Sequence, residues 1–154
     1  MEIIELKNWE NNSDDSKFTK IYSQFSELLK ELRRKDLSEN VIESINQDLA
    51  EVNASQTEAK QLRKLISKKQ TKIIQLLEKE LKITPKNYYR VQWMILGMPI
   101  FGIPFGIALG LSINNFAILA AGLPMGMGIG IALGSRMDKK AADEGRQLDF
   151  EINF

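Results

Sequence analysis

The longest apolar stretch of the chain covers residues 91–135, where 45 consecutive positions contain no Asp, Glu, Lys or Arg. A helix needs about 20 apolar residues to cross the hydrocarbon core of a bilayer. Asn114-Asn115 supplies a turn between two such helices, because asparagine tolerates left-handed backbone. The pattern predicts two membrane spans, residues 91–113 and 116–135. Two core helices of a soluble protein are the poorer interpretation, since so short a chain could not cover them.

Glycine recurs at every fourth position in both predicted spans. The helix-packing set is Gly102, Gly106 and Gly110 in the first span and Gly122, Gly126, Gly130 and Gly134 in the second. Residues four apart share one helix face, so each span has a groove that lets another backbone approach closely. The pattern predicts glycine-zipper packing within the hairpin, and a further small face at Gly128 leaves room for a homo-oligomer.

The residues that flank the spans predict the topology. Positive residues remain on the cytoplasmic side, and amphipathic aromatic residues lie at the interface. The expected interface anchors are Tyr88, Tyr89, Arg90, Trp93, Arg136, Lys139 and Lys140. We therefore expect a multi-pass protein of the cytoplasmic membrane, with both termini in the cytoplasm and residues 137–154 as a cytoplasmic tail.

Before the spans, apolar residues recur at threes and fours, which predicts amphipathic helices. The expected fold is an all-α membrane protein in which a cytoplasmic helical or coiled-coil region, residues 1–84, precedes the transmembrane hairpin, residues 85–136. Whether residues 38–82 form one helix or two stays open, although Ser55–Glu58 matches a capping box. Thr84-Pro85 is expected to end one helix and cap the next.

Both ends of the chain have strand-like patterns. Apolar residues alternate with polar ones from Gln147 to Phe154, and Glu2–Leu6 could also be extended. Short β-strands at the termini are therefore expected, and they would need to dock on the helices, because a two-stranded ribbon alone is marginal in water.

Charge divides the helical region. Residues 36–58 carry six acids and no base, whereas residues 60–90 carry ten bases and two acids. Within the basic stretch the four-residue series is Lys60, Lys64, Lys68 and Lys72. These lysines could pair with an acidic helix folded back on them, contact anionic lipid headgroups, or be solvated. Nucleic acid is not an expected partner, because aromatic residues do not interleave the basic stretch.

The composition argues against an enzyme. The chain has no cysteine and no histidine, which removes the thiolate nucleophile and the usual general base. No cofactor or metal is expected. The predicted spans carry no ionisable residue, which disfavours coupled transport.

Two charged segments flank the spans: Lys86-Asn87-Tyr88-Tyr89-Arg90, and Met137–Ala141 with Glu144–Leu148. With the glycine period, they resemble a group of small, uncharacterised bacterial two-span membrane proteins with glycine-zipper helices. The resemblance implies a bacterial inner membrane and supplies no catalytic residues.

The function expected from these patterns is that of a non-enzymatic, membrane-anchored helical scaffold or adaptor. It would self-associate through its glycine-zipper helices, and its cytoplasmic helices would bind an unidentified protein partner. The alternative is an oligomeric pore or a membrane-disrupting effector, because glycine-lined spans with prolines can line a conduit.

Overall fold

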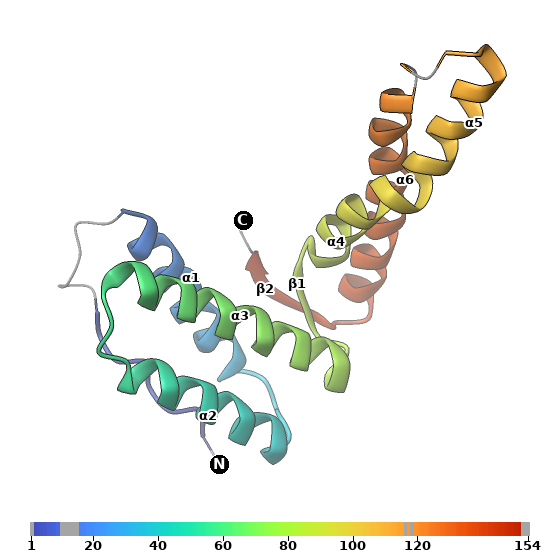
Figure 1. Cartoon of the computed structure of the whole chain (residues 1–154). Helices are drawn as coiled ribbons and strands as arrows, with labels where there is room; N and C mark the ends of the chain where they lie inside the picture. The colour runs from blue at the N-terminus through green and yellow to red at the C-terminus, as the bar shows by residue number, and fades with distance from the viewer. Residues whose placement is uncertain (1, 10–15, 116, 118, 152–154) are drawn as a thin grey trace. The chain divides into compact units, whose positions relative to one another are not determined.

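The structure is a computed structural model that describes residues 2–9, 16–115, 117 and 119–151. The chain is mostly helical and forms two compact units, Met1–Ile83 and Thr84–Phe154. Figure 1 shows a group of helices in the first unit, and a long helical hairpin with a short two-stranded ribbon in the second.

Three helices build the first unit: α1 (Ser16–Leu32), α2 (Glu39–Ala54) and α3 (Ala59–Leu81). The apolar residues at threes and fours form one buried face on each helix, as the sequence pattern predicts. The fully buried side chains of this core include Phe25, Leu28, Leu29, Leu32, Ile45, Leu49, Leu62, Ile66, Ile73, Ile74 and Leu77.

Residues 38–82 form two helices rather than one. The first ends at Ala54, and Ser55 has extended backbone with φ −64° and ψ 133°. The N-cap of α3 is Glu58, and the Ser55 hydroxyl lies 2.8 Å from the Thr57 hydroxyl. The capping box predicted at Ser55–Glu58 is therefore wrong: Ser55 terminates α2 instead of capping α3.

Residues 2–9 run as an extended segment against the helices. They belong to no sheet, so the strand expected at Glu2–Leu6 is absent from this described segment. The side chains of Ile3 and Trp9 are buried. Asn46 and Asn53 of α2 form hydrogen bonds with the backbone of this segment.

The second unit begins with β1 (Thr84–Lys86) and continues as one unbroken helical rod. Within the rod, α4 (Tyr88–Gly97) and α5 (Ile103–Ile113) are joined by the π-helical turn η2 (Met98–Gly102). The long helix α6 (Leu119–Asp143) packs against all three elements, and β2 (Gln147–Glu151) follows. We call the rod together with α6 the helical hairpin.

The π turn contains Pro99, which has no N–H to donate within the helix. In this turn the Ile103 N–H bonds the Met98 carbonyl five residues earlier. The rod ends at Asn114, which adopts the left-handed conformation with φ 52° and ψ 37°. Its predicted role as a turn residue agrees with this geometry. Residues 116 and 118 of the predicted second span lie outside the described residues.

The sequence suggested that Thr84-Pro85 caps the next helix, but in the structure it does not. Lys82, with φ 57°, ends α3 in the left-handed conformation, and Thr84–Lys86 then forms β1. This strand pairs in parallel with β2, in the register Thr84 to Gln147 and Lys86 to Glu151, with a bulge between. Residues 147–151 of the alternating C-terminal pattern thus form a strand, and its partner is β1; residues 152–154 of the pattern lie outside the described residues.

Part of the predicted cytoplasmic tail, residues 137–154, forms regular structure in the second unit. Residues 137–143 continue α6, and residues 147–151 form β2. The Lys86 ammonium pairs with the Asp149 carboxylate, and the Asn87 side-chain amide donates to the Glu151 carboxylate at 2.7 Å. The ribbon therefore joins the two ends of the helical hairpin.

Candidate functional site

The helical hairpin is held by close contact between two backbones. A Cβ added at Gly102 would lie 2.8 Å from the Gly122 carbonyl oxygen, and a Cβ at Gly130 would overlap the Trp93 carbonyl. Gly134 faces the backbone of Tyr89 and Arg90 in the same way. As the residue numbers increase along α6, the residue numbers of their contacts in the rod decrease, so the two helices are antiparallel. Only glycine allows this separation.

The predicted glycines do not all share one environment. Gly97 does not belong to the predicted packing set, but it meets Gly126 and Gly130 across the seam. Gly106 meets Leu119, and Gly110 is buried near the turn. Gly128 is exposed, and a Cβ there would meet nothing within 4 Å. The seam therefore uses every fourth residue of α6 from Gly122 to Gly134 and excludes Gly128.

The hairpin presents its large side chains outward. Among the described residues, every exposed large apolar side chain except Ile4 belongs to it; these are Ile95, Leu96, Ile100, Ile103, Phe105, Ile107, Leu111, Ile113, Leu123, Met125 and Met137. Glycines are inside and large apolar residues are outside. This is the reverse of the arrangement in a water-soluble helical pair, where the large apolar side chains are buried.

One described helix, Tyr88–Ile113, is long and apolar enough to cross a membrane. Only 22% of its most apolar 18-residue window is buried within the protein. A core helix of a soluble protein would be largely covered by the rest of the chain, whereas most of this window is not.

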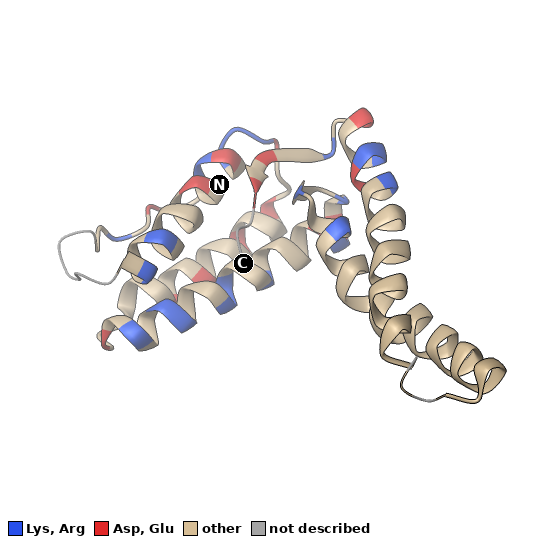
Figure 2. Ribbon diagram, turned by 90° about the horizontal axis from the view of Figure 1, so that it is seen from above, with Lys and Arg blue, Asp and Glu red and all other residues tan. Residues whose placement is uncertain are grey.

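Charged residues of the second unit gather at one end of the hairpin, next to the ribbon (Figure 2). The residues predicted as interface anchors lie there, on the first turns of α4 and the last turns of α6. The Tyr88 and Tyr89 rings meet edge to face at 5.3 Å, and both are half-buried. Trp93 is also half-buried, whereas Arg90, Arg136, Lys139 and Lys140 are exposed.

A buried carboxylate lies among these cations. Asp138 is 6% exposed and accepts hydrogen bonds from the backbone N–H groups of Tyr89, at 3.0 Å, and Arg90, at 2.9 Å. These are two of the N–H groups that a helix cannot satisfy internally at its first turn. A carboxylate there also complements the positive end of the helix dipole. Asp138 of α6 thus caps α4.

In the first unit, α2 and α3 are joined by a buried ion pair. The Lys69 ammonium lies 2.8 Å from Asp48 Oδ1 and 2.5 Å from Glu51, and Lys72 approaches the same oxygen of Asp48 at 2.8 Å. Burial opposes ionisation of Asp48, but the hydrogen bonds from the two lysines outweigh it and lower the pKa of Asp48. Burial likewise opposes the charge of Lys69, yet its carboxylate partners raise its pKa.

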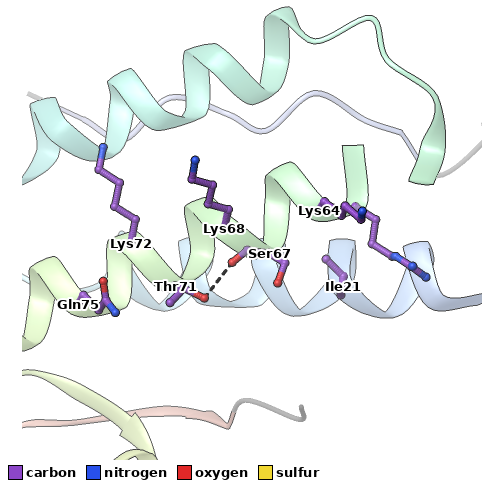
Figure 3. Close-up of a pocket in the computed structure, with 8 residues that line it drawn as sticks. Ile21, Lys64, Ser67, Lys68, Thr71, Lys72 and Gln75 are labelled. Carbon is purple, nitrogen blue, oxygen red and sulfur yellow. Dashed lines mark hydrogen bonds between the residues drawn. The ribbon is translucent and has the colours of Figure 1, made fainter. Parts of the chain in front are cut away.

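Of the four predicted lysines, only Lys72 contacts α2 among the described ion pairs; Lys60, Lys64 and Lys68 are exposed. The lysine that the acidic helix buries is Lys69, which lies outside the four-residue series. An open groove runs along α3 beside Ile21 of α1 and is lined by Arg63, Lys64, Ser67, Lys68, Thr71, Lys72 and Gln75 (Figure 3). This basic groove is suited to anions, since its cationic side chains outnumber its neutral polar ones.

No protein-family model, curated protein or solved structure matches this chain. The resemblance to bacterial two-span proteins therefore stays a prediction.

Proposed function

We propose that this chain is a non-enzymatic integral membrane protein that crosses the bilayer twice. The helical hairpin is the membrane anchor, and the helical unit is an adaptor that binds a protein partner on the cytoplasmic side. The observation that carries the proposal is the inverted packing of the hairpin, with glycine at the seam and isoleucine, leucine, phenylalanine and methionine exposed.

The second span is proposed from its packing. From Leu119 to Ser135, α6 has no charged residue, and its glycines lie against the rod that is long enough to cross a membrane. A helix held in backbone contact over that length enters the same environment as its partner. Hydrocarbon also requires every backbone group to be bonded internally, and two antiparallel helices meet that requirement.

The charge at the ribbon end supports cytoplasmic termini. Arg136, Lys139, Lys140 and Arg90 gather there, and the turn at Asn114-Asn115 carries no charge. Positive residues near the ends of spans are retained in the cytoplasm.

Cysteine labelling tests both the spans and the topology. The chain has no cysteine, so Asn115→Cys and Gln147→Cys each introduce a single thiol. We expect an impermeant maleimide to label position 115 from outside intact cells and position 147 only after lysis. A soluble cytoplasmic control protein is labelled only after lysis. The same behaviour at both positions would overturn the anchor. Labelling of position 147 from outside, with position 115 labelled only after lysis, would reverse the topology.

The pore alternative predicts a different result. The seam glycines are covered by backbone within one hairpin, so they line no conduit there. Purified protein in liposomes should therefore not release an entrapped dye. Release that depends on oligomer formation would favour the pore over the adaptor.

A further inference from the structure

Residues 2–9 are held against α2 in the way that a bound peptide is held, through the backbone. Asn46 accepts from the Ile4 N–H at 2.9 Å and donates to the Glu2 carbonyl at 2.9 Å. Each side-chain amide can bridge a donor and an acceptor of an extended chain in this way.

Asn53 repeats the same contact one step along. It accepts from the Lys7 N–H at 2.8 Å and donates to the Glu5 carbonyl at 2.8 Å. Both asparagines bond the N–H of one residue and the carbonyl two positions before it. The contact is therefore a repeat rather than an isolated hydrogen bond.

The spacing of the two contacts matches the geometry of the two chains. Asn46 and Asn53 are seven residues apart, which is two helical turns and about 10.5 Å along one face. Ile4 and Lys7 are three residues apart, which is about 10 Å of extended backbone. An extended chain running parallel to α2 thus meets one asparagine at every third residue.

Further hydrogen bonds come from the α1 side. The Tyr22 hydroxyl donates to the Lys7 carbonyl, at 3.2 Å, and the Arg33 guanidinium donates to the Ile4 carbonyl, at 2.9 Å. All of these bonds involve main-chain atoms of the segment, which any sequence except proline could supply. The side chains that the protein buries are those of Ile3 and Trp9, while Leu6 between them is half-buried.

We infer that the surface formed by Tyr22, Arg33, Asn46 and Asn53 is a peptide-binding site, and that residues 2–9 are its built-in occupant. The partner is an extended polypeptide segment with an apolar residue at every third position. It would enter parallel to α2, in place of residues 2–9. This inference rests on the proposed adaptor role and names the chemistry of the partner.

The test frees the site in the full-length chain. Ile4→Pro with Lys7→Pro removes the two backbone donors and leaves the asparagines intact. In a Trp93→Phe background Trp9 is the only tryptophan, so its red-shifted emission reports release of the segment. We then titrate a fluorescein-labelled synthetic peptide of residues 1–9. It should bind the proline variant at least tenfold more tightly than the wild-type chain, whose own segment competes at high effective concentration.

The asparagines supply the matched control. Adding Asn46→Ala and Asn53→Ala to the proline variant should weaken peptide binding at least tenfold, whereas Asn40→Ala, an exposed asparagine of the same helix, should leave it unchanged. A peptide N-methylated at Ile4 and Lys7 should also fail to bind. Each of these losses would support capture through the backbone.

Three results would overturn the inference. These are a Trp9 that stays buried in the proline variant, a released Trp9 with no peptide binding, and loss of helical circular dichroism, which would make the segment an integral part of the core. Resistance to alkaline extraction, measured on the same protein, reports the membrane anchor separately. A failed peptide site with an intact anchor would therefore leave the membrane proposal standing.

Discussion

The Asp138 carboxylate accepts the backbone N–H of Arg90 at 2.9 Å, across 48 residues of sequence. With its second bond to Tyr89, it closes the base of the helical hairpin. We predict that Asp138→Ala lowers the free energy of unfolding by about 2–3 kcal/mol, because two N–H groups at the start of α4 lose a charged acceptor. Thermal unfolding of the full-length chain in detergent measures the change.

Asp143→Ala is the matched control for this substitution, because Asp143 is an exposed acid of the same helix. Asp138→Asn should fall between the two, since the amide oxygen keeps one bond while the amide nitrogen opposes the second N–H. Equal unfolding temperatures for the Asp138 and Asp143 variants would contradict the capping role.

Gly130 and Gly128 provide a test of the seam in which the same substitution has opposite effects. Gly130→Ala should cost about 1–3 kcal/mol, because the added methyl group overlaps the Trp93 carbonyl and must separate the helices. Gly128→Ala should stabilise the helix by up to about 1 kcal/mol, because nothing lies within 4 Å and alanine is the better helix former. Cross-linking between cysteines placed across the seam would follow the same order.

The buried pair of Asp48 and Lys69 predicts how stability depends on pH. The pKa of Asp48 is lower in the folded state than in the unfolded chain, where it is about 3.9. Below that value the unfolded state binds more protons, so stability falls until the pH passes the folded pKa. Asp48→Asn should lose this acid-dependent part of the stability curve. It should also cost about 2–4 kcal/mol at neutral pH, because Lys69 loses a buried partner.

The basic groove should respond differently from the buried pair. Lys64→Gln with Lys68→Gln should leave stability within about 0.5 kcal/mol, because both side chains are exposed. Lys69→Gln should be clearly destabilising, since it leaves Asp48 with one fewer cation. If the groove binds anionic headgroups, the wild-type chain is better protected from proteolysis in anionic liposomes than in neutral ones. The double variant should lose this difference. A double variant as unstable as Lys69→Gln would contradict this division.

Periodicity was sufficient to predict which regions are helical, but not whether residues 38–82 form one helix or two. Apolar residues at threes and fours correspond to the buried faces of α1, α2 and α3, and the uncharged stretch corresponds to the rod and most of α6. Asn114 ends the rod where two neighbouring asparagines suggested a turn. Such signals are local, because helix faces and left-handed positions depend on residues within a few positions of one another.

Contacts between distant residues could not be predicted in this way. In the sequence, Asp138 is one acid in a positively charged flank, and Lys69 is one of ten bases in its stretch. Only their burial in the structure distinguishes these two residues from their charged neighbours. The strand β1 is three residues long and exists because β2 lies beside it. Asn46 and Asn53 could have been noticed in the sequence. Asparagine is a poor helix former, and these two asparagines lie seven residues apart, on one face of the same helix.

The parallel ribbon also makes the hairpin depend on residues at both of its ends. Because β1 precedes the rod and β2 follows α6, the pair of strands links the first turn of one helix to the last turn of the other. A chain truncated before Gln147 would lose this link and would keep the glycine seam as the main contact between the two helices.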